Sequence, residues 1–257
     1  MFASPTFAQS NMPSNTILTQ ENSEAVQFSS FPTVYDNLDQ LADRGAPEGR
    51  RAAGTRNCNS LELLAVVPTI DVLYPNEERY LVPIGKTVAG HPTFWFYLSE
   101  TIPAPVIETL TFSVLDEQDK LVSNIVVDVP ESHGLFSVTW PNHEEPLQVG
   151  VDYRWLLELQ LSLSTSSCSL TEQNTDPTEI DNLFVEGFIQ RIALNIAQTE
   201  QLASTAFSLA SVSTLVELGV WYDAFDVAMS LQGFSDDTDM VINNLLASIG
   251  LTDVSVD

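Results

Sequence analysis

The sequence predicts a mainly β fold, an immunoglobulin-like antiparallel β-sandwich, followed by a C-terminal helical hairpin and a third helix. Short apolar runs with period-two alternation recur through the middle of the chain, and the spacing becomes helical near residue 195. Residues 91–98 contain four consecutive aromatic residues and no Asp, Glu, Lys or Arg. Aromatic side chains at this density need cover on both faces, so we expect a central strand here.

The other strands are expected in order along the chain. We predict them at residues 61–67, 79–84, 108–115, 121–129, 134–140, 153–164 and 183–192. Pro83 lacks a backbone donor and marks its strand as an edge strand. The strand from Tyr153 has the clearest alternation, and the turn before it resembles the tyrosine corner of immunoglobulin-like sandwiches, in which the phenol bonds nearby backbone.

The C-terminal part is predicted to be helical. We expect one helix over residues 196–218, a break at Gly219 and a second helix from Val220. The pair resembles a single tetratricopeptide hairpin, which cannot form a solenoid by itself, so we expect it to dock on the sandwich. A third helix over residues 236–248 has an acidic first turn and ends at Gly250.

The predicted domain organisation is a flexible leader, a sandwich and a docked helical segment. These cover residues 1–43, 44–194 and 195–257. Nine Lys and Arg stand against 35 Asp and Glu, giving a net charge of −26. This balance argues against nucleic-acid binding and against anionic membrane surfaces. No apolar window is long enough to span a bilayer, and we expect no cofactor and no metal.

Two features suggest an extracytoplasmic protein, periplasmic or secreted. Residues 1–10 resemble the last part of a secretory signal, with a possible cleavage after Ala8, although the basic and apolar regions are missing. Cys58 and Cys168 are the two cysteines, and in an exported protein we expect them to form one disulfide. The alternative is two buried free thiols in a cytosolic protein.

A basic loop is the first candidate site. Residues 44–56 hold four of the nine basic residues among glycines and a proline. Arg50, Arg51 and Arg56 could bind an anion, or they could pair with acidic groups of the same molecule, and we favour ion pairing. Glu186 and Arg191 are candidate members of the same site.

Glu186 is also the one carboxylate that suggests catalysis. It lies inside an apolar strand, where a raised pKa could suit a glycosidase acid. No second carboxylate can be named as its partner, so we favour a structural ion pair, for example with an arginine of the basic loop. His91, His133 and His143 form no zinc-protease motif, and no nucleophile-elbow or dinucleotide motif is present, so we assign no catalytic residue.

Several short motifs occur together in a fixed order. They are Gly45-Ala46-Pro47, Arg51, Gly54-Thr55-Arg56, Cys58, Val67-Pro68, His91 to Tyr97, Tyr153-Arg154-Trp155, Val185 to Arg191 and Gly219 to Ala224. In this order they resemble a cyanobacterial family known as domain of unknown function 928, over about residues 44–251. The resemblance implies an exported cyanobacterial protein and implies no activity.

Three functional hypotheses follow. The first is an exported, non-enzymatic binding or scaffold module whose partner is an envelope protein or polymer. The second is a glycoside or other hydrolase centred on Glu186. The third is an adaptor that docks a partner through its helical hairpin, for which an exposed apolar groove on the hairpin would be the sign.

Overall fold

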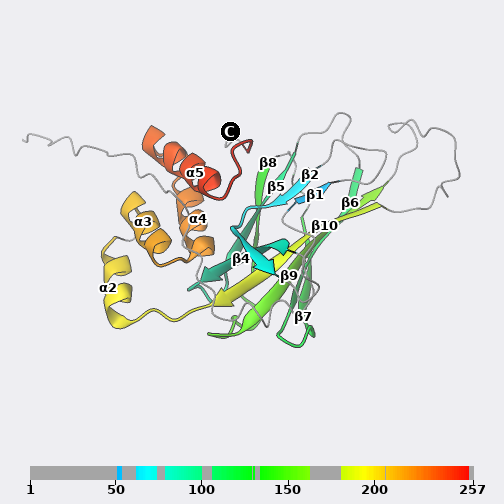
Figure 1. Cartoon of the computed structure of the whole chain (residues 1–257), viewed down its shortest axis with the longest axis horizontal. Helices are drawn as coiled ribbons and strands as arrows, with labels where there is room; N and C mark the ends of the chain where they lie inside the picture. Colours follow the sequence, from blue (N-terminus) through cyan, green and yellow to red (C-terminus); the bar gives the residue numbers. More distant parts are fainter. Residues whose placement is uncertain are drawn as a thin grey trace, which may run out of the picture.

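The computed structural model describes residues 51–53, 62–73, 79–99, 106–128, 130, 134–162, 181–205 and 207–254. Two β-sheets pack face to face, and four helices gather at one end of them (Figure 1). The predicted mainly β fold with a helical tail is therefore confirmed. Within the described part of the chain, no helix is long and apolar enough to cross a membrane.

The smaller sheet has four strands in the order β1-β2-β5-β8. Their bounds are β1 Arg51–Ala53, β2 Glu62–Ala65, β5 Thr93–Leu98 and β8 Gly134–Thr139. The aromatic strand β5 lies between β2 and β8, as predicted, because its side chains meet partners on both faces. Phe94 and Phe96 are buried toward the other sheet, and Trp95 points to the opposite face.

The larger sheet has six strands in the order β3-β4-β10-β9-β6-β7. Their bounds are β3 Thr69–Leu73, β4 Arg79–Thr87, β6 Val106–Leu115, β7 Leu121–Val127, β9 Asp152–Ser162 and β10 Asp181–Arg191. All neighbouring pairs are antiparallel except β4 and β10, which are parallel. The prediction of a purely antiparallel sandwich is wrong at this pair.

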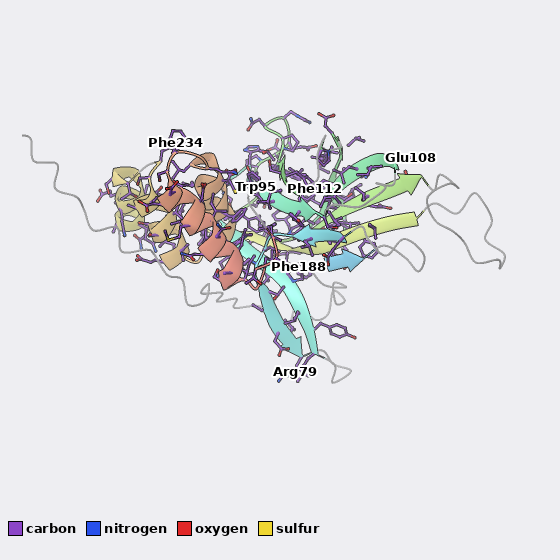
Figure 2. The ribbon with its side chains drawn as sticks, turned by 90° about the horizontal axis from the view of Figure 1, so that it is seen from above. Arg79, Trp95, Glu108, Phe112, Phe188 and Phe234 are labelled. Atoms are coloured by element: carbon purple, nitrogen blue, oxygen red, sulfur yellow. The ribbon has the colours of Figure 1, made fainter. Side chains whose placement is uncertain are left out.

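Strand β4 is not the edge strand that Pro83 suggested. Its first half pairs with β3, which the sequence analysis missed, and its second half pairs with β10 from Ile84 onward. Pro83 lies where β4 changes neighbours, so its missing N–H interrupts neither ladder. Figure 2 shows β3 and the start of β4 projecting from the sandwich as an arm, with Arg79 at its tip. Arg79 pairs there with Asp71 at 2.7 Å.

Aromatic rings from both sheets form the centre of the core. The ring of Phe94 lies 4.7 Å from that of Phe112, and the Trp155 indole lies 5.7 Å from the ring of Phe96. Gly187 makes room for this indole, because a Cβ there would lie 2.5 Å from an indole carbon of Trp155. Two layers of strands therefore close over the aromatic strand, as predicted.

The predicted tyrosine-corner hydrogen bond is present. The backbone N–H of Gln148 donates to the Tyr153 hydroxyl oxygen over 3.2 Å. Tyr153 is buried at the start of β9, so the bond fixes the loop that leads into this strand. The alternation predicted for the strand is also confirmed, since Trp155, Leu157 and Leu159 are all buried.

The helical tail contains one more helix than predicted. The helices are α2 Ile196–Ser204, α3 Leu209–Glu217, α4 Trp221–Ser230 and α5 Asp236–Ser248. The single helix expected over residues 196–218 is wrong, because the chain turns between α2 and α3. The cause is local: Ser208 accepts a hydrogen bond from the N–H of Ser211 and caps a new helix. Helix α5 has the predicted bounds.

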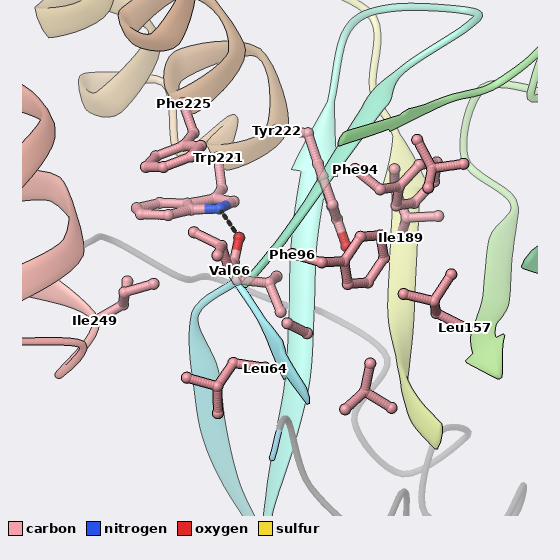
Figure 3. Close-up of a cluster of buried hydrophobic side chains, with 14 of the residues drawn as sticks. Leu64, Val66, Phe94, Phe96, Leu157, Ile189, Trp221, Tyr222, Phe225 and Ile249 are labelled. Carbon is pink, nitrogen blue, oxygen red and sulfur yellow. Dashed lines mark hydrogen bonds between the residues drawn. The ribbon is translucent and has the colours of Figure 1, made fainter. Parts of the chain in front are cut away.

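Helix α4 joins the helical layer to the sandwich. Figure 3 shows the Trp221 indole donating to the carbonyl oxygen of Val66, a bond of 2.8 Å, with Phe225 stacked on the same indole. The Trp155 indole donates to the Tyr222 hydroxyl over 2.9 Å, and this hydroxyl donates to the Phe188 carbonyl over 3.3 Å. All three donors are buried, so these bonds form in a medium where their loss is costly.

A glycine in β4 allows this approach. A Cβ at Gly85 would lie 2.8 Å from a ring carbon of Tyr222, so only glycine lets the phenol pass over the strand. On β5 of the smaller sheet, Trp95 donates to Asp226 over 3.1 Å. The docking of the hairpin on the sandwich thus depends on side chains of one helix, α4, and on space left by one small residue.

We expect Tyr222→Phe to lower the free energy of unfolding by about 1–3 kcal/mol, because the indole N–H of Trp155 loses its acceptor in a buried site. Urea unfolding followed by intrinsic fluorescence measures this change. Tyr97→Phe is the control, because it removes a tyrosine hydroxyl from a half-buried position on β5. We expect it to change the free energy of unfolding by no more than about 0.5 kcal/mol. Equal effects of the two variants would contradict the role given to the Tyr222 hydroxyl.

Candidate binding site in the helical layer

Glu186, the candidate acid, forms an ion pair on the outer face of the six-stranded sheet. Arg154 of the adjacent strand donates to its Oε2 from Nη2 over 2.6 Å and from Nε over 3.0 Å. Glu186 is buried, and its cross-strand neighbour is the apolar Leu156. The favoured structural ion pair is present, with Arg154 as the partner.

Arg191 serves a structural role at the other end of β10. Its guanidinium donates to the carbonyl oxygen of Leu147 over 2.8 Å and to that of Val88 over 3.3 Å. It therefore ties two loops together and does not meet Glu186. Of the other predicted residues, Arg50, Arg56, Cys58 and Cys168 lie outside the described residues, and only the backbone of Arg51 is described, in β1.

The histidines provide no site in the described part of the chain. His91 lies with Nε2 3.1 Å from the carbonyl oxygen of Glu144, and His143 is exposed, while His133 is outside the described residues. Among the residues that the structure describes, no group of three or more His, Cys, Asp or Glu is placed to hold a metal ion.

A hollow in the helical layer, which we call the helical pocket, is the best candidate for a binding site. Its volume is about 360 Å³. Helices α2, α3 and α4 form it together with the residues that precede α2 and follow β4. Its apolar wall includes Val88, Leu202, Ala203, Phe207, Leu215 and Val227. A volume of this size suits a small molecule or the apolar side chains of a partner.

Among the described residues that line the pocket, Asp223 is the one that carries a charge. It lies in the first turn of α4, and its carboxylate accepts hydrogen bonds from the backbone N–H groups of Val88 at 3.0 Å and Ala89 at 3.2 Å. Burial raises the pKa of Asp223 to about 6, while hydrogen bonds from the Thr87 side chain and from backbone groups limit the rise. The residue therefore both holds the β4–β5 turn against α4 and supplies a negative group to the pocket.

Phe207 marks the rim of the helical pocket. Its side chain is 81% exposed, and its backbone has a φ of +53°, which is uncommon for a residue other than glycine. This conformation belongs to the turn between α2 and α3, the same turn that separates the two helices. The turn costs backbone strain and leaves a large apolar side chain in water beside an apolar hollow.

The helical layer carries charge of only one sign. Residues 195–257 contain nine Asp and Glu and no Lys, Arg or His. The pocket is thus an apolar hollow in a negatively charged surface, and a positively charged partner with an apolar anchor is complementary to it.

Sequence reasoning named the helical hairpin as a possible docking element but identified none of the residues of this site. Neither Glu186 nor Arg191, the two predicted residues with described side chains, lines the helical pocket. The pocket exists because α2 and α3 are separate helices, and a single helix was predicted in their place. One signal was readable in the sequence: a segment of more than sixty residues without a single basic residue.

The raised pKa of Asp223 predicts a pH dependence of stability. The protonated form of Asp223 is favoured in the folded protein. Its contribution to the free energy of unfolding is therefore complete below about pH 4 and is lost as the pH rises through about 6. Asp223→Asn lacks this titration but also loses one acceptor oxygen, which shifts its stability by a constant amount. The free energy of unfolding of the variant relative to that of the wild type should therefore rise over this range, by up to about 3 kcal/mol. Urea unfolding from pH 4 to pH 7 measures both profiles, and parallel profiles would contradict the assignment.

Comparisons with known proteins give one finding about the family. A family model described as Domain of Unknown Function (DUF928) matches residues 44–257. A search of the curated proteins and a search of the solved structures each found no match.

Proposed function

We propose, from the premise that the chain belongs to the DUF928 family, that the protein is a non-enzymatic binding module whose site is the helical pocket. The observation that supports this most directly is an apolar hollow with an exposed aromatic residue at its rim. Such a surface is costly in water and becomes favourable when a partner covers it.

The partner that we propose is a basic amphipathic segment of a protein, most simply a helix. Its apolar side chains would fill the pocket beside Leu202 and Leu215, and its Lys or Arg residues would face the acidic helical layer. This is the adaptor hypothesis in a specific form, since the hairpin that the sequence predicted is where the pocket lies. Charge complementarity would raise the association rate, and the buried anchor would provide most of the affinity.

A hydrolase centred on Glu186 is not the function we propose. Arg154 donates from Nε and Nη2 to one oxygen of this carboxylate, so Glu186 is held in a cross-strand ion pair. Glu186 and Arg154 support the sheet in this proposal.

We further propose that the sandwich is immunoglobulin-like. The order β2-β5-β8 in one sheet and β10-β9-β6-β7 in the other corresponds to the strand order of immunoglobulin domains. The tyrosine corner at Tyr153 supports the same assignment. The ring pairs of Trp155 with Phe94 and Phe96 lie where such domains often place a disulfide between the sheets. An experimental structure with a different order of β2-β5-β8 or of β10-β9-β6-β7 would contradict the assignment.

The binding proposal is tested with an amphipathic Leu–Lys peptide as the probe. Ala203→Trp places a large side chain at an exposed position of the pocket wall, so we expect peptide affinity to fall about tenfold or more. Ala210→Trp is the matched control, because Ala210 is exposed on α3 and does not line the pocket. Fluorescence anisotropy measures both affinities at physiological salt, where non-specific attraction is screened.

Two results would overturn this proposal. Equal affinities of Ala203→Trp and Ala210→Trp would mean that the peptide binds the acidic surface and not the pocket. The second result uses the neutral probe N-phenyl-1-naphthylamine. If the wild type binds this probe but not the peptide, and Ala203→Trp abolishes the probe binding, the hollow is a small-molecule pocket instead.

We also propose that the protein acts outside the cytoplasm, in a cyanobacterial envelope, with Cys58 and Cys168 joined by a disulfide. The cysteines lie in two segments outside the described residues, and the strands that flank these segments are close together, which supports this pairing. Glu62 follows the Cys58 segment, and Ser162 and Asp181 flank the Cys168 segment. Glu62 bonds Ser99 at the end of β5, and β10 packs against β2. The two segments therefore leave neighbouring strands.

A thiol assay tests the disulfide. We expect denatured protein isolated from its native compartment to show no reactive thiol, because both sulfurs are consumed by one bond. The same sample after reduction serves as the control and should release both thiols. Two thiols before reduction would reject the disulfide and would remove its support for export.

A further inference from the structure

Phe234 is a second large aromatic side chain that the helical layer leaves in water. It is 80% exposed and lies in the short connection between α4 and α5 (Figure 2). Among the described residues of the layer, the other exposed aromatic residue is Phe207, at the rim of the helical pocket. A single exposed apolar side chain is ordinary on a protein surface, so the position of these two relative to each other is what matters.

The two phenylalanines lie at the same end of the hairpin that α3 and α4 form. These helices pack together and are joined by residues 218–220, so they run antiparallel. The start of α3 and the end of α4 are therefore neighbours in space. Phe207 precedes the first residue of α3 by two positions, and Phe234 follows the last residue of α4 by four.

The wall of the helical pocket leads along α4 toward Phe234. Asp223 and Val227 line the pocket from this helix, four residues apart and thus on one face of it. Phe234 follows Val227 by seven residues, which is about 10 Å along a helix axis. The chain keeps winding over most of this distance, because hydrogen bonds between residues three apart close the turns after Ser230. One partner helix is therefore long enough to reach both the pocket and Phe234.

The turn between α4 and α5 fixes the backbone of Phe234. Its N–H donates to the carbonyl oxygen of Leu231 over 3.2 Å, and the preceding Gly233 has a φ of +76°, a conformation that favours glycine. Directly after it, the Ser235 side chain caps α5 by accepting from the N–H of Thr238 over 3.3 Å. A partner meets a ring on an ordered backbone and loses little binding free energy by ordering it.

The charge of the helical layer selects the kind of partner. Asp236 and Asp237 are exposed and follow Phe234 in the first turn of α5. Residues 195–257 contain no Lys, Arg or His, so a second copy of this layer or an anionic lipid surface would meet charge of the same sign. A basic segment meets opposite charge on every side of the exposed ring.

From these features we infer that Phe234 is a second anchor point for the partner of the helical pocket, a basic amphipathic helix with two apolar groups about two turns apart. The inference rests on the proposed function and adds to it the length and the spacing of the partner. One apolar group fills the pocket, and the other covers the ring of Phe234. The Lys or Arg residues between and beside them face the acidic layer.

Two peptides test the inference by fluorescence anisotropy on the full chain. The two-anchor probe is a Leu–Lys helix with leucine clusters about two turns apart, and the one-anchor probe has alanine in place of the leucines of one cluster. Both carry the same charge. We expect Phe234→Ser to weaken binding of the two-anchor probe about tenfold and to change binding of the one-anchor probe by less than about twofold, because only the longer apolar face reaches position 234.

Ile196→Ser is the matched control. Ile196 is 79% exposed and belongs to the same acidic layer, but it begins α2, at the opposite end of that helix from the Phe207 turn. We expect it to change the affinity for either probe by less than about twofold. Thermal unfolding of both serine variants checks that the fold is intact, which the exposure of both side chains favours.

The outcomes separate this inference from the proposed function. If Ala203→Trp weakens binding of the two-anchor probe and Phe234→Ser does not, the pocket binds the partner and the second anchor is wrong. Equal effects of Phe234→Ser and Ile196→Ser, or equal losses for the two probes, would also overturn the inference. If Ala203→Trp weakens neither probe, the proposed function is wrong, and a loss caused by Phe234→Ser alone would overturn the two-anchor arrangement with it.

Discussion

The hydrogen bond from the Trp155 indole to the Tyr222 hydroxyl joins the two halves of the molecule. Trp155 belongs to the aromatic core between the sheets, and Tyr222 belongs to the helix that closes one end of it. A buried indole N–H needs an acceptor, and Trp155 is buried, so the sandwich depends on the helical layer for a satisfied core. The relation is mutual, because α4 is held by Val66, Phe188 and the β4–β5 turn.

The helical pocket is a consequence of this attachment. Docking α4 through Trp221, Tyr222 and Asp223 fixes one wall, and the turn at Phe207 sets α2 and α3 against it. Residues that hold the layer in place and residues that line the hollow are therefore neighbours on the same helix, and Asp223 does both. A partner that occupied the pocket would contact the same turn that anchors the layer to the sheets.

Patterns of period two and isolated local signals predicted much of the sandwich, because they depend on which face of a strand is buried. The central position of β5, the alternation of β9 and the bond of Tyr153 followed from residues within one strand or its adjoining turn. Within the sandwich, the error at β4 concerns a choice between partners distant in sequence. Pro83 marked a real change in pairing, but the sequence does not say that β10 would continue the ladder in parallel.

The site was harder to predict for the same reason. Glu186 and Arg191 stood out because charged residues inside an apolar strand are conspicuous, and each proved to support local structure. Asp223 is inconspicuous in an amphipathic helix. Its position becomes informative only when Thr87, Val88 and Ala89 are brought against it by the fold, more than 130 residues away in the chain.

The order of synthesis along the chain makes the contacts between α4 and the core among the last that can form. The strands of both sheets precede residue 192, yet the residues that seal the indole of Trp155 and the carbonyl of Val66 come afterward. A chain emerging from the ribosome therefore cannot complete its interior until Trp221 and Tyr222 are available. Premature termination in α4 would leave the hydrophobic centre open at one end, and such a product is a natural target for proteolysis.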